Sequence, residues 1–127
     1  MREIIYTENA PKPIGPYSQA VRVADTYYFS GQIGLDPTTG QFDSETDVDM
    51  QAKRVMQNIE ALLTASGLTW DHVVKSSIFL KDMNDFPKVN AIYGSHFSQG
   101  KYPARETVQV SRLPKDALVE ISVICVK

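Results

Sequence analysis

The sequence predicts an α+β fold in which one β-sheet carries two helices on a single face. Strand-like segments outnumber helical ones, the two helical segments are separated by a strand, and no internal repeat divides the chain. The length of 127 residues, 43% of them hydrophobic, is enough for one compact core. We therefore expect a single domain that spans residues 1–127.

The first half of the chain predicts a hairpin followed by a long helix. Residues 19–24 and 26–35 read as two strands that meet at Asp25, and the turn sequence DPTTG follows them. From Asp47 onward, apolar side chains recur every three or four residues. This pattern predicts an amphipathic helix of about five turns with Gly67 as its C-terminal cap.

The second half predicts a strand, a helix and a second hairpin. Residues 73–81 form the strand candidate, and residues 82–97 form a helix with Pro87 near its first turn. The last hairpin is expected to pair residues 104–111 with residues 118–126 around an intervening turn.

An oligomer is expected from the two faces of the last strand. If both helices cover one face of the sheet, the other face must meet water or another subunit. Ile124 and Val126 make that other face of the last strand partly apolar.

Composition and charge argue against several classes of protein. The net charge is −2 and the basic residues are scattered, whereas nucleic-acid binders usually carry a basic surface. The N-terminal segment has no signal-like apolar run and contains Glu3 and Glu8, so we expect a cytoplasmic protein without a membrane partner.

The single cysteine, Cys125, is predicted to be a buried thiol. His72 and His96 have no partners at ligand spacing, so neither a metal nor another cofactor is expected.

A cation and a carboxylate in the last two strands are the first candidates for chemistry. Alternation places Arg105 and Thr107 on the face of their strand that points away from the helix-covered core, and Glu120 on the same exposed side of the hairpin. One interpretation is a surface ion pair worth ~0–1 kcal/mol. The hairpin register instead sets Glu120 opposite Ser111, so the other interpretation is a site assembled between neighbouring subunits.

Four further residues are ambiguous on pattern alone. Asn90 falls within the apolar stripe of the second helix, where its amide needs either a structural hydrogen bond or a ligand. Tyr17 follows a Gly-Pro turn and could lie over a cleft or in the core. Ser30 and Gly31 end a strand, where a glycine often marks a bulge or a close approach of the backbone to a ligand.

Five sequence blocks in order, covering nearly the whole chain, resemble the Rid family of small deaminases. The blocks are PIGPYSQA, FSGQ, NIEALL, KSSIFLKDMNDFPKVNAIY and PARETVQVSRLPKDALVEI. The resemblance implies a chorismate-mutase-like α+β fold of the bacillus type and a homotrimer with clefts between subunits. It also implies hydrolysis of 2-imino acids, such as 2-iminobutanoate and 2-iminopropanoate (the imine of 2-aminoacrylate), to 2-oxo acids and ammonia without a cofactor. These reactive imines are by-products of pyridoxal-phosphate enzymes.

The resemblance also implies roles for individual residues. Arg105 would hold the substrate carboxylate with its planar guanidinium. Glu120 would position or activate the attacking water, helped by the backbone at Thr107. The other cleft residues implied are Tyr17, Ser30, Gly31 and Asn90.

The sequence departs from the family pattern at three positions, and two other functions remain open. Glu106 stands where the family usually has a small residue; it should point to the opposite face from Arg105, but at the strand's start it could curl back and neutralise the guanidinium. Thr107 replaces a frequent cysteine, and Ser122 a second glutamate. The alternatives are an endoribonuclease or translation inhibitor, disfavoured by the charge, and a non-catalytic sensor or holdase that binds carboxylates.

Overall fold

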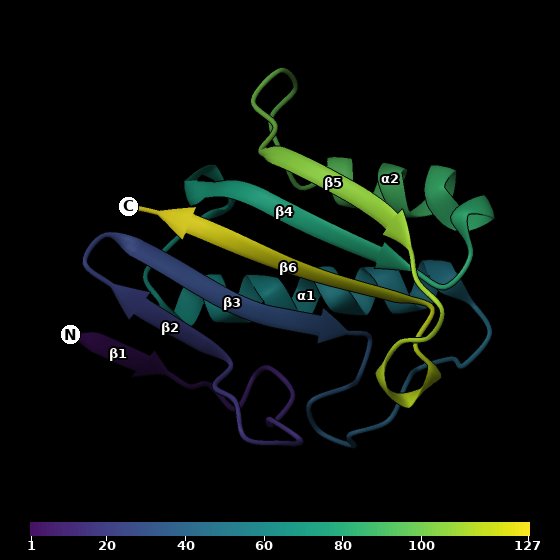
Figure 1. Ribbon diagram of the computed structural model, residues 1–127, viewed down its shortest axis with the longest axis horizontal. Helices are drawn as coiled ribbons and strands as arrows, with labels where there is room; N and C mark the ends of the chain where they lie inside the picture. Colours follow the sequence, from purple (N-terminus) through teal and green to yellow (C-terminus); the bar gives the residue numbers. More distant parts are fainter.

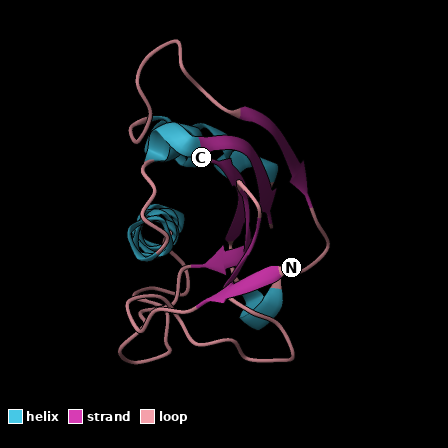
Figure 2. Ribbon diagram, turned by 90° about the vertical axis from the view of Figure 1, so that its left-hand side faces the viewer, coloured by secondary structure: helices cyan, strands magenta, loops and turns pink.

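The computed structural model describes residues 1–127 as one curved sheet with two helices on the same side of it (Figures 1 and 2). The strands are β1 (Arg2–Ile5), β2 (Ala20–Val23), β3 (Thr26–Ile33), β4 (Val73–Leu80), β5 (Ala104–Gln109) and β6 (Val119–Val126). The helices are α1 (Val48–Ala65) and α2 (Phe86–Gly94), and three short 3-10 turns cover Trp70–His72, Met83–Asp85 and Pro114–Asp116. Neither helix has the length and apolar character needed to cross a membrane.

The sheet is mixed and mainly antiparallel. Its strand order is β1-β2-β3-β6-β4-β5. Only β4 and β5 run parallel, and α2 lies in the connection between them. The predicted hairpin of β2 and β3 is confirmed. Strand β1 was not anticipated, because four exposed or half-exposed residues are too few to show an alternating pattern.

The predicted hairpin between the last two strands is wrong. Strand β6 pairs with β3 on one side and β4 on the other, whereas β5 pairs only with β4, at the edge of the sheet. The physical reason is burial: β6 is apolar enough on both faces for a central position, and β5 is largely exposed. Strands β5 and β6, which follow one another in sequence, are therefore separated in space by β4 (Figure 1).

The direction of the Arg105 side chain was also predicted wrongly. In the parallel register, Arg105 is the partner of Ser76 and Thr107 is the partner of Ile78. Ser76 is buried and its hydroxyl accepts a hydrogen bond from Tyr93 of α2 at 2.9 Å. Arg105 and Thr107 therefore face the helices, whereas the apolar Val108, 42% exposed, lies on the uncovered face.

Helix α1 forms the main core against the centre of the sheet. Asp47 caps its N-terminus by accepting hydrogen bonds from the backbone of Asp49 and Met50, and Gly67 follows with a φ of 71°. Its buried apolar face consists of Ala52, Val55, Met56, Ile59, Leu62 and Leu63, each at most 1% exposed. Burying one such large side chain contributes about 1.5–3 kcal/mol. Cys125 is fully buried in this core, and burial raises the pKa of its thiol to about 12.

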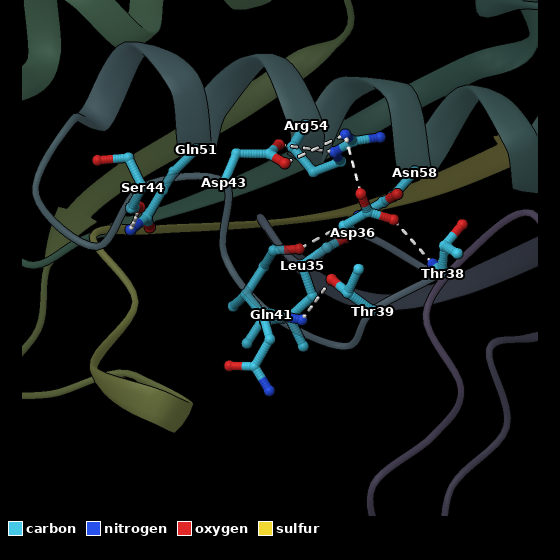
Figure 3. Close-up of polar contacts among 11 residues, drawn as sticks. Leu35, Asp36, Thr38, Thr39, Gln41, Asp43, Ser44, Gln51, Arg54 and Asn58 are labelled. Carbon is cyan, nitrogen blue, oxygen red and sulfur yellow. Dashed lines mark hydrogen bonds and ion pairs between the residues drawn. The ribbon is translucent and has the colours of Figure 1, made fainter.

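Two buried amides on α1 fix the ends of β3 and β6. Asn58 donates to the carbonyls of Ile33 and Leu35 at 3.3 and 3.0 Å, and Gln51 accepts from the backbone of Leu118 at 2.9 Å. Gln51 also donates to the carbonyl of Ser44, in the loop between β3 and α1 (Figure 3).

The same loop is held to α1 by charges. Arg54 donates to the carboxylate of Asp43 at 2.9 Å and lies 3.6 Å from that of Asp36 (Figure 3). Helix α1 thus holds the end of β3, the start of β6 and the loop after β3. The pocket described next lies beside these two strands.

Candidate active site

A pocket of about 340 Å³ lies where β3 and β6 meet, on the face of the sheet that the helices leave uncovered. We call it the Glu120 pocket. Four of the predicted site residues line it: Tyr17, Ser30, Gly31 and Glu120. The structure thus brings together residues from β3, β6 and the loop before β2.

A β-bulge shapes the floor of the Glu120 pocket. Strand β3 shifts register against β6 at Ser30 and Gly31, which confirms the bulge expected from the sequence. The Ser30 hydroxyl donates to the carbonyl of Ser18 at 2.6 Å, and the Ser30 backbone N–H donates to the carbonyl of Gln19 at 2.9 Å. These bonds tie the bulge to the segment that carries Tyr17.

Tyr17 lies at the rim of the pocket and not in the core. It is 47% exposed, and its hydroxyl accepts a hydrogen bond from the backbone of Ile14 at 3.3 Å. Its own backbone N–H donates to the carbonyl of Gly15 at 2.9 Å, so a tight turn fixes the ring. The ring is thus held at the rim of the pocket that Glu120 also lines.

The carboxyl group of Glu120 lies directly against Gly31. A Cβ atom at position 31 would be 2.7 Å from both the Cδ and an Oε atom of Glu120, so the Glu120 side chain would have to move to admit it. No cation lies within 4 Å of this carboxylate, and burial raises its pKa above the ordinary value. A partly desolvated carboxylate without a counter-ion is a stronger base than an exposed one.

We expect Gly31→Ala to lower the free energy of unfolding by about 1–3 kcal/mol, because the new methyl group must displace the Glu120 carboxyl. The check is a double-mutant cycle measured by denaturant unfolding. In the Glu120→Ala background the space is free, so the same Gly31→Ala change should cost clearly less. An equal loss of stability in both backgrounds would contradict the contact.

A second pocket, of about 610 Å³, lies between α2 and the start of β5. We call it the Arg105 pocket. The Arg105 Nη1 donates to the Asn90 side-chain oxygen at 2.8 Å, and its Cζ lies 5.1 and 5.5 Å from the ring centroids of Tyr93 and Phe86. No carboxylate lies within 4 Å of the guanidinium. The cation is therefore held by an amide and two rings that leave its charge unneutralised.

Asn90 is exposed, so its expected position inside the apolar stripe is wrong. The buried stripe of α2 is narrow and contains only Val89 and Tyr93. The partner of the Asn90 amide is Arg105, not a loop.

The predicted cation and carboxylate are not on the same side of one hairpin. Arg105 faces α2, whereas Glu120 lies on the opposite face of the sheet, and β4 runs between their strands. They form no ion pair within the chain. Thr107 lines neither pocket, and its buried hydroxyl has no hydrogen-bond partner. Each pocket therefore contains only part of the predicted site.

Glu106 does not curl back toward Arg105. Its carboxylate forms an ion pair with Lys75 at 2.9 Å and accepts a hydrogen bond from Ser77. These contacts, that with Lys75 first, lower the pKa of Glu106. The side chain lies on the opposite face of the strand from Arg105, as the alternation of the strand predicts.

Among the pocket residues that were missed from the sequence are a lysine and a tyrosine. Lys12 lines the Glu120 pocket, and Tyr102 lines the Arg105 pocket. Both lie in loops next to prolines, where no periodic pattern predicts the direction of a side chain. Elsewhere in the chain, no three His, Cys, Asp or Glu side chains are grouped as in a metal site.

Comparison with known proteins extends over almost all of the chain. The model of the Endoribonuclease L-PSP family matches residues 7–127. A RutC family protein of Pyrococcus horikoshii is 50% identical over 127 residues, which cover 100% of this chain and 99% of the relative. Proteins named 2-iminobutanoate/2-iminopropanoate deaminase from Mus musculus and Salmonella typhimurium are 47% and 44% identical. These matches cover 100% of this chain and 93% and 99% of the two relatives.

Solved structures have the same fold. A Rid family protein from Yersinia pestis superposes with a TM-score of 0.96 at 45% identity, covering 100% of both chains. TdcF from E. coli, solved with bound serine, gives a TM-score of 0.90 at 40% identity and 98% coverage of both chains.

Proposed function

Because the chain belongs to the Endoribonuclease L-PSP family, which includes the Rid proteins, we propose that it hydrolyses 2-imino acids to 2-oxo acids and ammonia. The substrates proposed are 2-iminobutanoate and 2-iminopropanoate, the compounds named in two of its relatives. The observation that carries the proposal is a free guanidinium in one pocket and a desolvated, unpaired carboxylate in another. The serine bound to TdcF supports the binding of a small amino or imino acid in such a fold.

Arg105 is the group that holds the substrate carboxylate. A guanidinium presents two parallel N–H donors that match the two oxygens of a carboxylate, which a lysine does not. Asn90, Tyr93 and Phe86 fix the guanidinium without competing for its charge. The substrate would thus be oriented by its acid group, and its imine carbon would lie a fixed distance away.

Glu120 is the base that activates water. The carboxylate takes a proton as the water oxygen bonds to the electrophilic carbon of the protonated imine. The same proton then passes to the nitrogen of the tetrahedral adduct. As the C–N bond breaks, the hydroxyl group of the adduct gives its proton to Glu120, which leaves the 2-oxo acid and ammonia, and Glu120 then passes this proton to the ammonia. Tyr17 and the Ser30–Gly31 bulge limit the space around this carboxylate. No electrons are exchanged, so orientation and one base are sufficient for the reaction.

The two pockets must belong to different protomers for one substrate to reach both groups. They lie on opposite faces of a continuous sheet, so a single chain cannot join them. We therefore propose a homotrimer with three shared clefts, each receiving Arg105 from one protomer and Glu120 from its neighbour. The uncovered face supports such an assembly, because it exposes Tyr28, Val108 and Val126 at 49%, 42% and 42%.

The proposed activity is tested by a coupled assay. A threonine dehydratase generates 2-iminobutanoate, semicarbazide traps the imine, and release of the 2-oxo acid is followed with and without the protein. We expect the protein to accelerate release at the expense of the trapped imine. No acceleration would rule out a deaminase, and binding of 2-oxobutanoate without turnover would point to the sensor function instead.

We expect Glu106→Ser to leave turnover of 2-iminobutanoate within about twofold of the parent, because an exposed ion pair on the other face contributes little. The measurement is kcat/KM in the coupled assay. A clear rise in kcat/KM would show that Glu106 competes for the guanidinium of Arg105 after all.

The geometry gives no support to RNA cleavage. Neither His72 nor His96 lines the Glu120 pocket or the Arg105 pocket. The His72 ring accepts a hydrogen bond from the backbone of Thr69 at 3.0 Å, and the His96 ring packs on Trp70. Acid–base cleavage of RNA by a pair of imidazoles therefore has no place in either pocket.

A further inference from the structure

The Glu120 pocket contains a second charged side chain, Lys12. Of all the residues that line this pocket, only Lys12 and Glu120 carry a charge. Lys12 makes no ion pair: no carboxylate of the chain, Glu120 included, lies within 4 Å of its ammonium group. The positive charge of Lys12 is therefore not paired with Glu120 and is free to bind an anionic group of a ligand.

The backbone that carries Lys12 is held rigidly. Gln19, 1% exposed, donates from its side-chain amide to the carbonyls of Thr7, Ala10 and Pro11 at 3.0, 3.2 and 2.9 Å. Pro11 and Pro13 flank Lys12, and a residue before a proline is restricted to an extended conformation. Because the backbone of Lys12 is fixed beside the pocket, only the rotation of its own side chain moves the ammonium group.

The rest of the pocket favours an aliphatic chain. The apolar part of its lining consists of Ile14, Ile33, Leu35 and two prolines, Pro11 and Pro114. In the proposed reaction, Arg105 of the neighbouring protomer holds the acid group next to the imine, which leaves the substrate's side chain in the Glu120 pocket. A methylene chain that ends in an anion would satisfy both the apolar lining and the ammonium group.

We propose that Lys12 makes the Glu120 pocket select 2-imino dicarboxylates, that is, imines whose side chain ends in a second carboxylate. The proposal rests on the deaminase function above, because it names the class of substrate that the same site prefers. Lys12 is a specificity-determining residue in this scheme and takes no part in the proton transfers at the imine.

The test compares two imines of equal chain length. Amino-acid oxidases generate 2-iminopentanedioate from glutamate and 2-iminopentanoate from norvaline, and kcat/KM is measured for each against semicarbazide trapping. The two imines differ only in the terminal carboxylate. We expect the parent protein to prefer 2-iminopentanedioate by about tenfold, the effect of one added contact between charged groups.

The variant that isolates the charge is Lys12→Met, which keeps the length of the side chain. It should abolish most of the preference, and Lys12→Arg should retain it. Lys53→Met is the matched control, because Lys53 is exposed on α1, lines neither pocket and makes no ion pair. The preference should also shrink when the salt concentration rises from about 0.01 to 1 M, which shortens the Debye length from about 30 to 3 Å.

The failure of this proposal is distinguishable from the failure of the deaminase function. If both imines are accelerated but Lys12→Met has the same preference as the parent, the role of Lys12 is overturned. If neither imine is accelerated, the deaminase function fails, and calorimetry with the products 2-oxopentanedioate and 2-oxopentanoate decides about Lys12. Tighter binding of the dicarboxylate that is lost in Lys12→Met would support the cation site, and equal binding would overturn it.

Discussion

Replacing Arg105 by alanine is expected to lower kcat/KM for 2-iminobutanoate by about 10- to 100-fold. Charge-assisted hydrogen bonds to a carboxylate contribute about 1.5–3 kcal/mol, and each 1.4 kcal/mol corresponds to a factor of ten. Arg105→Lys keeps the charge but loses the paired donors, so its loss should be intermediate. The loss should appear mainly in KM, because the contact forms on substrate binding.

Arg22→Ala is the matched control for this experiment. Arg22 lies on β2 at the far side of the sheet, where it is 3.7 Å from Glu3, and it lines neither pocket. The Arg22→Ala substitution removes one positive charge, as Arg105→Ala does, and should leave kcat/KM near that of the parent protein. An equal loss in both variants would show that Arg105 acts only through the overall charge.

Glu120→Gln is expected to lower kcat by about 10²- to 10⁴-fold with a much smaller change in KM, because the amide keeps the shape of the side chain but cannot take a proton. In the parent, kcat/KM should fall as the pH falls through the pKa of Glu120, since only the carboxylate is a base. Burial raises this pKa, so the acid limb should lie above the range of an ordinary carboxyl group. A pH profile of the coupled assay measures both effects.

The same variant should gain stability while it loses activity. Because the pKa of Glu120 is higher in the folded than in the unfolded chain, the charged carboxylate destabilises the fold above the folded pKa. This penalty disappears as the pH falls below the unfolded value. Glu120→Gln should therefore unfold at a higher temperature than the parent at pH 7 but not at pH 3. A lower Tm at pH 7 would show that Glu120 stabilises the fold instead.

Mixing the two inactive variants tests whether the site is shared. In a trimer of randomly assorted subunits, a cleft with an intact Arg105 and an intact Glu120 forms in about a quarter of cases. Arg105→Ala and Glu120→Gln, unfolded together and refolded as a mixture, should recover roughly that fraction of activity. No recovery would place both groups in the cleft of one chain.

Local features of the fold, the β2–β3 hairpin included, could be predicted from the sequence, but the pairing of β5 and β6 could not. Helix α1 has a capping Asp47, a regular apolar stripe and Gly67, all within one stretch of chain. The bulge at Gly31 was likewise visible as a glycine inside a strand pattern. The position of β6 between β3 and β4 depends on contacts between distant segments, which no local pattern contains.

The error in the position of Arg105 comes from the face that was assigned to the side chains of β5. Counting alternation from Val108 placed Arg105 on the uncovered face, because apolar side chains were assumed to lie under the helices. In fact α2 packs over Arg105 with Tyr93 and Phe86, and Val108 lies on the uncovered face. The face of Glu120 could thus be predicted from the sequence, but that of Arg105 could not.

The continuous sheet that separates Arg105 from Glu120 has a consequence for how this protein becomes active. With the shared cleft proposed above, a newly made chain would complete its fold, core and caps included, and still be inert, since catalysis would begin only after it binds its neighbours. At low concentration, activity would therefore increase more than in proportion to the protein concentration. Dilution alone would inactivate the protein while each chain stays folded.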